Sequence, residues 1–462
     1  MPAAVPSAAD NLRKWRFTSG NGIVARGGGK AKREYELDII DLSHDGRGVA
    51  RVEGKTVFVS GALPAERVRA QQTGRNRHFD EAKTLEVLQA SPDRVAPECP
   101  HFGVCSGCVL QHLAPARQIE AKQRTLTENL QRIGHVQPET VLPAMVSEPW
   151  GYRRKGRFSV RYVEKKGGVL VGFRETDPRF VAQLAGCRTV VPAVDALIVP
   201  LTELIGAMQA KREIPQVEFI QGDGPVALVF RHLTPLQPED LALLLAFGEA
   251  QNAQVFLQPG GVHTVHPIRE GYPELGFDLG EDIRFSFRPL DFIQVNAALN
   301  RRMIDKAIEL LAPTADDVIL DLFCGLGNFT LPLAKHAGQV VGVEGDHGLV
   351  ARAKANAERN GIGNAEFFAA DLTQDLSAQL WKGQRFSKLL LDPPRAGAIE
   401  VLKQLDLRGV GRIVYVSCHP ASLARDAGYL VQERGYTLVA AGAMDMFPQT
   451  AHVESIAVFE AV

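Results

Sequence analysis

The sequence contains no run of apolar residues that approaches about eighteen positions, the length that a membrane-spanning helix needs. It therefore shows no membrane span and no apolar core of a secretory signal. We expect a cytoplasmic protein without membrane contact. A dominant charge is also missing, because 52 Lys and Arg balance 53 Asp and Glu to a net charge of -1. Any nucleic-acid surface must then come from local clusters of basic residues.

Cysteine is scarce, with 6 residues in a chain of 462. In a reducing cytoplasm so few thiols exclude a disulfide framework and favour metal binding or catalysis. The chain is too long for one ordinary hydrophobic core, so we expect two to four domains.

The N-terminal part predicts a tail followed by a small barrel. Residues 1–33 lack apolar periodicity and carry basic residues without acids from residue 11 onward, which is typical of a disordered basic tail. Between residues 34 and 93, short apolar stretches alternate with glycine turns, the pattern of an antiparallel barrel that binds oligonucleotides. The motif Asp45-Gly-Arg-Gly-Val-Ala50 resembles a TRAM domain. Its later strands carry basic residues suited to phosphate contacts: Arg67, Arg69, Arg75, Arg77 and Lys83.

The rest of the chain divides into two regions that each contain helices and strands. Residues 94–290 predict a central α+β domain, with a helix over 115–134 and several strands. In residues 291–462, apolar runs alternate with amphipathic segments, which predicts a Rossmann-like, doubly wound sheet with ligands at the carboxyl ends of its strands. The last two runs lack a helix between them and predict an antiparallel pair at the sheet edge. The expected strands are Val318–Leu322, Gln339–Glu344, Ala365–Asp371, Leu389–Asp392, Ile413–Cys418, Tyr436–Ala441 and His452–Phe459.

Acidic residues end three successive strands of this C-terminal domain. Asp321 opens the glycine-rich loop that ends at Thr330, Glu344 ends the next strand, and Asp371 ends the third. An acid in the glycine-rich loop would repel a pyrophosphate but suits a cationic methionine group. Glu344 can accept the ribose hydroxyls of a nucleoside, and Asp371 can bond its adenine amino group. The pattern favours S-adenosylmethionine as the ligand.

Two further motifs predict the reaction site. Asp392-Pro-Pro-Arg395 resembles the element of amino methyltransferases, but Arg395 replaces the aromatic residue that stacks a base, so amino methylation is disfavoured. Cys418 lies where a strand ends and a helix begins. A helix N-terminus and a nearby arginine both favour the thiolate, so we expect a lowered pKa. A thiolate can add to carbon 6 of uracil and make carbon 5 nucleophilic. Glu454 on the last strand is the candidate base for the carbon 5 proton.

Four of the six cysteines predict a metal site. Cys99, Cys105 and Cys108 lie close together, and Cys187 follows in a separate segment. Four thiolates suit zinc or an iron–sulfur cluster, and the spacing alone does not choose between them. Elsewhere, the segment Tyr152–Phe158 interleaves basic and aromatic residues, a combination that binds single-stranded RNA.

These motifs together resemble the RNA uracil-5-methyltransferase family over nearly the whole chain. The barrel and the cysteine set make the chain most similar to members that act on 23S ribosomal RNA. The resemblance implies Cys418 as the nucleophile, Glu454 as the base, and a [4Fe-4S] cluster on Cys99, Cys105, Cys108 and Cys187. One departure is Ser106, where the family often has glycine. The implied contacts of S-adenosylmethionine are Gln294, Phe323, Asn328, Glu344, Asp371 and Asp392.

Two alternatives stay open. One is the same chemistry on transfer RNA, although transfer-RNA members generally lack the barrel and the cluster cysteines. The other is an iron–sulfur RNA-binding or redox-sensing protein with an inactive methyltransferase fold, which the presence of Cys418 and Glu454 disfavours. We expect a monomer with no obligate protein partner.

Overall fold

The computed structural model describes residues 33–280 and 282–462, so the basic tail predicted at 1–33 lies outside the described residues except for Arg33. The chain forms two compact units. The first extends to Ala121 and includes the short segment Gln449–Ala451, and the second comprises Lys122–Pro448 and His452–Val462. Across the described ranges, no helix has both the length and the apolar character to cross a membrane.

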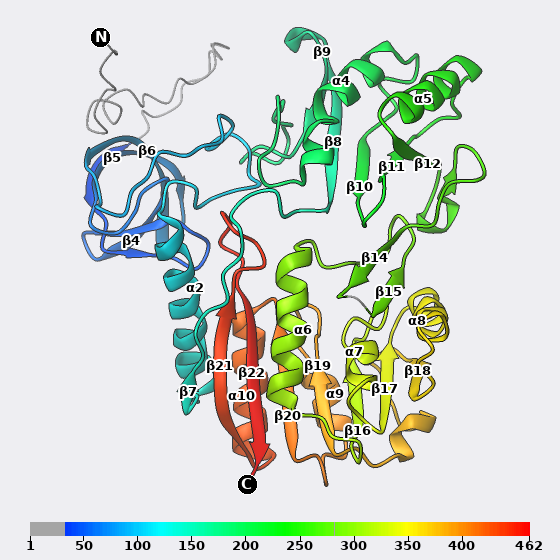
Figure 1. The fold of residues 1–462 in the computed structure, drawn as a ribbon. Helices are drawn as coiled ribbons and strands as arrows, with labels where there is room; N and C mark the ends of the chain where they lie inside the picture. Colours follow the sequence, from blue (N-terminus) through cyan, green and yellow to red (C-terminus); the bar gives the residue numbers. More distant parts are fainter. Residues whose placement is uncertain (1–32, 281) are drawn as a thin grey trace, which may run out of the picture. The chain divides into compact units, whose positions relative to one another are not determined.

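The first unit contains a six-stranded barrel in the order β1-β5-β6-β4-β3-β2 (blue in Figure 1). Between β1 and β2, the Ile40 N–H donates to Val49 O at 2.8 Å, so the same segment pairs with β5 and then with β3. Alternate residues fill the interior, among them Leu37, Val57 and Val68. The strands are β1 (Glu34–Asp38), β2 (Asp41–Leu42), β3 (Gly48–Val52), β4 (Lys55–Ser60), β5 (Arg67–Arg75) and β6 (Phe79–Gln89).

Helix α2 (Pro115–Asn129) begins in the first unit and ends in the second. A π-helical turn, η2 (Leu130–Gly134), continues it, so the helix predicted over 115–134 is confirmed. The second unit then forms a six-stranded sheet in the order β13-β12-β11-β10-β8-β9, antiparallel except between β11 and β12. Its strands are β8 (Lys155–Val163), β9 (Gly168–Gly172), β10 (Gln216–Ile220), β11 (Val226–Arg231), β12 (Ala253–Gln258) and β13 (His266–Pro267).

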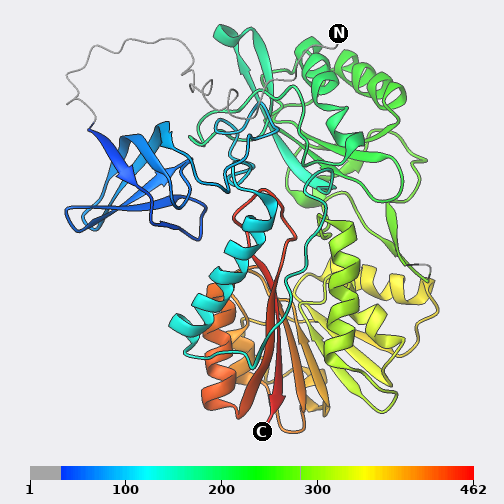
Figure 2. The same cartoon turned by 60° about the vertical axis from the view of Figure 1, so that its left-hand side comes forward.

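Short helices and a hairpin accompany this sheet (green in Figures 1 and 2). The helices are α3 (Pro192–Asp195), α4 (Ile198–Ala207) and α5 (Pro238–Ala250), with the 3-10 turns η3 (Glu164–Lys166) and η4 (Val262–Thr264). The hairpin of β14 (Gly276–Leu279) and β15 (Ile283–Ser286) leads toward the C-terminal sheet.

The C-terminal sheet has eight strands in the order β18-β17-β16-β19-β20-β22-β21-β7. Five parallel strands from β18 to β20 confirm the predicted doubly wound sheet. The final antiparallel pair is confirmed, but its predicted place at the edge is wrong, because β7 pairs in parallel with β21 beyond it. The strands are β7 (Thr140–Val141), β16 (Val318–Leu322), β17 (Gln339–Glu344), β18 (Ala365–Ala369), β19 (Lys388–Leu391), β20 (Arg412–Ser417), β21 (Tyr436–Met444) and β22 (Glu454–Ala461).

Helices pack on both faces of this sheet (Figure 2), and the core between them is apolar. Because the parallel strands are buried on both sides, they read as continuous apolar runs rather than alternating ones. The carboxyl ends of β16, β17, β19 and β20 consequently lie at one edge. The helices are α6 (Ala297–Leu311), α7 (Thr330–Ala334), α8 (His347–Arg359), η5 (Leu380–Gly383), α9 (Ile399–Gln404) and α10 (Pro420–Glu433).

Candidate active site

The loop after β16 turns sharply because three of its residues have left-handed backbone conformations. Phe323 has φ +66°, and Gly325 and Gly327 have φ values of +57° and +90°. Glycine adopts such angles without strain, whereas phenylalanine does so at a cost. The strained Phe323 lies where the sequence predicts contact with the cofactor.

Asp321 lies at the end of β16 beneath this loop and has no exposed surface. Its Oδ2 accepts a hydrogen bond from Thr330 Oγ1 at 2.5 Å, while its Oδ1 has no partner among the described residues. Burial, together with the nearby carboxyls of Asp392 and Glu344, raises the pKa of Asp321 to about 8. A buried carboxyl with an unpaired oxygen favours a ligand that brings positive charge or a donor.

The two acids predicted to hold the nucleoside are more accessible. Glu344 accepts hydrogen bonds from the Gly325 N–H at 3.1 Å and from the Asp346 N–H at 3.0 Å. Asp371 is exposed, and hydrogen bonds from the Thr373 hydroxyl and N–H lower its pKa. Both side chains therefore stay polar and hydrated, as groups that bind hydroxyl and amino groups require.

Two other predicted contacts are fixed by residues that the sequence did not point to. Asn328 and Asn300 exchange two side-chain hydrogen bonds, at 2.9 and 3.0 Å. The backbone oxygen of Gln294 accepts from Arg154 Nε at 2.9 Å. Asn300 is buried on α6, and Arg154 lies directly before β8. Only the tertiary structure brings both residues to the site.

Asp392 directly follows β19, and burial raises its pKa to about 7. The loop that follows it is held by α10. Ser422 Oγ donates to Arg395 O at 2.5 Å, and the Ala398 N–H donates to Asp426 Oδ2 at 2.6 Å. Asp426 is completely buried and also accepts from Tyr415 Oη at 2.7 Å. These bonds place Arg395 close enough to influence Cys418 electrostatically.

Strand pairing brings the two predicted catalytic residues together. In the antiparallel pair β20 and β22, Ser417 lies opposite Ser455, and Ser455 Oγ donates to Ser417 O at 3.2 Å. Cys418 follows Ser417 and Glu454 precedes Ser455, so continuing this register by one residue places Cys418 opposite Glu454. Glu454 is 3% exposed and Cys418 is half-buried.

The prediction of a lowered pKa for Cys418 is wrong for the protein without ligands. Burial raises the pKa of Cys418 to about 11, and the charges of Glu454 and Asp392 contribute to the increase. Arg395 acts in the opposite direction but is outweighed. Burial, together with the charge of Asp392, also holds the pKa of Glu454 well above its usual value. The site thus gathers acids and a thiol whose charged forms a bound cation would stabilise.

The four predicted cluster cysteines belong to different units. Cys99, Cys105 and Cys108 lie in the first unit and Cys187 in the second. Within the first unit, the Gly107 N–H points to Cys105 Sγ at 3.4 Å, a type of contact that supports a metal-bound thiolate. Cys187 Sγ lies 3.1 Å from Thr189 Oγ1. In residues 33–280 and 282–462 the structure contains no assembled group of three or more potential metal ligands.

The predicted RNA-binding surface at Tyr152–Phe158 is largely wrong. Tyr152, Arg154 and Phe158 are 7%, 5% and 0% exposed. Tyr152 Oη donates to Pro448 O at 2.9 Å, and Lys155 Nζ donates to Leu290 O at 3.0 Å. Most of the segment is therefore structural, and Arg157 is its exposed basic residue.

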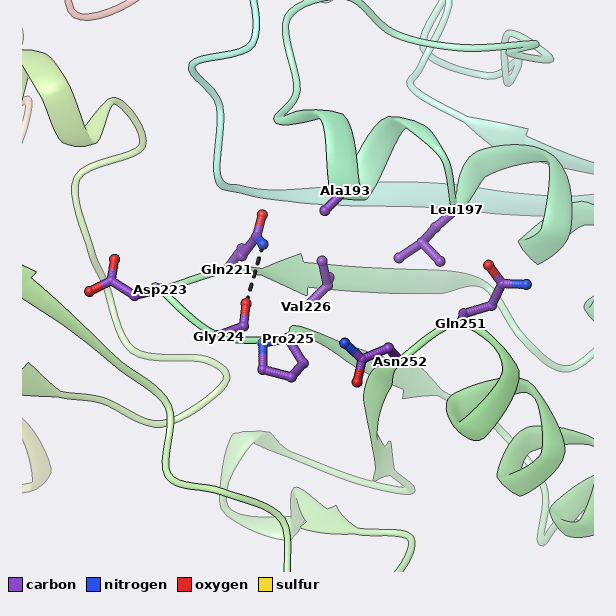
Figure 3. A pocket seen from close by; sticks show the side chains of 9 residues that line it. All are labelled: Ala193, Leu197, Gln221, Asp223, Gly224, Pro225, Val226, Gln251 and Asn252. Carbon is purple, nitrogen blue, oxygen red and sulfur yellow. Dashed lines mark hydrogen bonds between the residues drawn. The ribbon is translucent and has the colours of Figure 1, made fainter.

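A separate cavity of about 340 Å³ lies in the central sheet region (Figure 3). Gln221 Nε2 donates to Gly224 O at 3.2 Å across part of its wall. Its lining includes none of the predicted site residues. The candidate active site is consequently defined by strand ends and buried acids rather than by this cavity.

Comparisons with known proteins agree with this geometry. A family described as tRNA (Uracil-5-)-methyltransferase matches residues 279–462, and the TRAM domain matches residues 31–79. The chain is 64% identical over 430 residues to a Xanthomonas campestris protein named 23S rRNA (uracil(1939)-C(5))-methyltransferase RlmD, covering 92% of this chain and 97% of that one. A Stenotrophomonas maltophilia protein of the same name is 64% identical over 431 residues, with the same coverage.

A solved structure also shares the fold. The Pyrococcus abyssi tRNA (uracil-54, C5)-methyltransferase, in complex with S-adenosyl-L-homocysteine, aligns with a TM-score of 0.72 at 24% sequence identity. The alignment covers 92% of this chain and 100% of that one. At this identity the likeness establishes the fold alone.

Proposed function

This chain belongs to the RNA uracil-5-methyltransferase family, and from that premise we propose that it methylates carbon 5 of a uridine in 23S ribosomal RNA. The names of its relatives point to the uridine equivalent to position 1939 as the target. S-Adenosylmethionine is the proposed methyl donor. The protein would act as a cytoplasmic monomer.

The observation that carries this proposal is the register that places Cys418 opposite Glu454. A nucleophile and a base must reach neighbouring carbons of one uracil ring, and residues that face each other at the ends of two adjacent strands can do so. Asp392 lies within electrostatic range of both residues.

The proposed reaction uses the two residues in sequence. The Cys418 thiolate adds to carbon 6, and the electrons of the carbon 5–carbon 6 double bond move toward carbon 5. Carbon 5 would attack the sulfonium methyl of S-adenosylmethionine, whose methyl–sulfur bond breaks, and neutral S-adenosylhomocysteine would leave. Glu454 then takes the remaining carbon 5 proton, the double bond forms again, and the Cys418 thiolate leaves. Burial raises the pKa values of Cys418 and Glu454, which opposes the charged form that each residue needs in order to act.

The cofactor is proposed to lie along the strand ends already described. Glu344 would accept the ribose hydroxyls and Asp371 would bond the adenine amino group. Asp392 would lie toward the sulfonium, where its buried carboxyl gains most from a positive charge. Gln294, Phe323 and Asn328 would complete the contacts.

RNA binding is proposed to start at the TRAM domain. The basic residues predicted there are all exposed: Arg67, Arg69 and Arg75 on β5, Arg77 after it, and Lys83 on β6. Phosphate contacts of this kind weaken as salt rises, because counterion release drives them. The target uracil must also leave its stack to reach Cys418, at a cost of a few kcal/mol.

We further propose a [4Fe-4S] cluster on Cys99, Cys105, Cys108 and Cys187. Support comes from the thiol set and from the Gly107 N–H directed at Cys105 Sγ. Purified protein should contain iron and acid-labile sulfide in equal amounts and absorb near 400 nm. Zinc without iron after anaerobic purification would overturn the cluster but leave the methylation proposal intact.

The decisive test maps 5-methyluridine in cellular RNA. Cells that lack the protein should lose one 5-methyluridine from 23S ribosomal RNA, and the wild-type gene should restore it while Cys418→Ala should not. Loss from transfer RNA instead would assign the chemistry to that substrate. An unchanged 5-methyluridine pattern would favour the inactive, RNA-binding alternative.

A further inference from the structure

The loop between β21 and β22, which leads directly to Glu454, contains an unusual number of buried polar side chains. Asp445, Gln449 and Thr450 are 7%, 3% and 5% exposed, and Glu454 itself is 3% exposed. Buried polar groups are costly unless they are bonded, so such a loop needs partners that hold it in one conformation.

Gln118 of α2 is the partner at the centre of the loop. Its Nε2 donates to Gln449 Oε1 at 3.0 Å, and its Oε1 accepts from the Gln449 N–H at 3.1 Å. The same Nε2 lies within hydrogen-bond distance of Leu110 O at 3.0 Å and Leu113 O at 2.9 Å. Gln449 O in turn accepts from the N–H groups of Val109 and Leu110, both at 3.0 Å.

The backbone of Gln449 is strained, which makes this clamp necessary. Its φ of +68° lies in the left-handed region that residues other than glycine adopt at a cost of about 1–3 kcal/mol. Bonds to its N–H, its carbonyl and its side chain all fix that conformation. Without them the loop would relax toward ordinary backbone angles.

One turn further along α2, Lys122 holds the start of the same loop. Lys122 Nζ lies 2.6 Å from Asp445 Oδ1 and 3.0 Å from Phe447 O, and the side chain is 2% exposed. Residues four apart lie on one face of a helix, so Gln118 and Lys122 present a single polar stripe to the loop.

The far end of α2 supports the helix that follows the nucleophile. Gln432 Nε2 of α10 donates to Gly134 O at 3.0 Å, and a Cβ at Gly134 would collide with Ala424 O. Helix α10 begins at Pro420, two residues after Cys418. Within the second unit, the Ala443 N–H of β21 donates to Gln123 Oε1 of α2 at 2.9 Å.

We propose that Gln118 is a positioning residue for Glu454. It fixes the strained turn at Gln449, which lies five residues before the base, and so sets where β22 begins. Cys418 directly follows β20, which pairs with β19 on the side away from β22, so its position depends less on the Gln449 turn than that of Glu454 does. Loss of the clamp should therefore impair proton removal and leave thiol addition and methyl transfer largely unchanged. This inference rests on the proposed function.

The test separates the two halves of the reaction in the full-length protein. An RNA fragment that contains the target uridine is incubated with methyl-labelled S-adenosylmethionine, and the covalent RNA–protein adduct is followed on denaturing gels. Gln118→Met keeps the side-chain length and removes its hydrogen bonds. Gln449→Gly relaxes the φ strain and removes the side-chain partner. Gln131→Ala, an exposed glutamine in η2, is the matched control, and Glu454→Gln is the reference for blocked release.

We expect Gln118→Met to form adduct within about two-fold of the wild-type rate and to release product about 10- to 100-fold more slowly, because small displacements of a catalytic group cost that much. Gln449→Gly should show the same near-normal adduct formation and slowed product release, and Gln131→Ala should match wild type in both. Equal losses in adduct formation and release would make Gln118 merely structural and overturn the inference. Wild-type release in both clamp variants, with adduct trapped by Glu454→Gln, would overturn it as well. Absence of adduct in Glu454→Gln would instead refute the base assigned in the proposed function.

Discussion

Two groups of acids lie at the carboxyl edge of the same sheet, and they differ in their contact with water. On the cofactor side, Asp371 is exposed and Glu344 is half-buried, and both accept backbone N–H bonds. On the reaction side, Asp392 and Glu454 are buried and their pKa values are raised. Hydrated carboxylates suit the recognition of hydroxyl and amino groups, whereas buried ones suit proton transfer near neutral pH or a cationic ligand. The same residue type thus serves different purposes according to its burial.

If the two sides have separate roles, substitutions on each side should impair different steps of the reaction. We expect the largest loss of methylation from a substitution on the reaction side. Cys418→Ala should reduce methylation to background while S-adenosylmethionine binding by calorimetry stays within about two-fold of wild type. The thiol activates uracil and is not among the proposed cofactor contacts. Appreciable turnover by this variant would remove Cys418 from the mechanism.

The next effect concerns proton removal. Glu454→Gln keeps the side-chain shape but lacks a proton acceptor, so product release should slow by about 10²–10⁴-fold, the usual contribution of general base catalysis. A methylated adduct should accumulate and carry the label of the cofactor's methyl group. The double variant with Cys418→Ala should show no adduct. Release at the wild-type rate would assign the proton to another residue.

On the cofactor side we expect a loss of affinity without a stalled reaction. Glu344→Gln replaces a charged acceptor with a neutral one, which weakens bonds to the ribose hydroxyls by roughly 1.5–3 kcal/mol, or about 10- to 100-fold in binding. At saturating S-adenosylmethionine, methylation should approach the wild-type rate and no adduct should accumulate. Glu366→Gln, a substitution at an exposed acid on β18, is the control. A trapped adduct in Glu344→Gln would contradict the division between the two sides.

The smallest effect is a dependence on pH. Asp392 and Asp321 have pKa values raised to about 7 and about 8, so both bind protons at pH 6 and are charged at pH 8.5. A cationic sulfonium prefers the charged forms. Affinity for S-adenosylmethionine relative to the uncharged-sulfur product should therefore rise about 3- to 10-fold over this range.

The same shift has a consequence for stability. A carboxyl whose pKa is higher in the folded protein stabilises the fold below its unfolded pKa and loses that contribution as pH rises through the folded value. The ligand-free protein should consequently become less stable as pH rises from about 4 to about 8, with no further loss from these groups above that pH. A ratio of affinities that does not change with pH would mean that the acids do not face the sulfonium.

Much of the site could be predicted from the sequence because local runs of apolar residues identify the strands. Strands β16 and β17 begin and end at the predicted residues, and the acids that end them follow from chain order alone. Cys418 and Glu454 could be named because Cys418 directly follows one apolar run and Glu454 begins another. The prediction of an RNA-binding surface at Tyr152–Phe158 was largely wrong because the sequence does not show burial. Basic and aromatic residues form the same pattern whether their side chains bind RNA or support a core.

The sequence by itself determined the order of elements, the acids at the strand ends and the identity of the candidate nucleophile, since these depend on local periodicity and residue type. Only the tertiary structure decided the register of β20 against β22, the burial that raises the pKa of Cys418, and the supports supplied by Asn300, Asp426 and Gln118. Each of these depends on contacts between segments 28 to 331 residues apart or on the exclusion of water. A local sequence pattern does not reveal long-range contacts or burial, because strand pairing and desolvation exist only once the chain has folded.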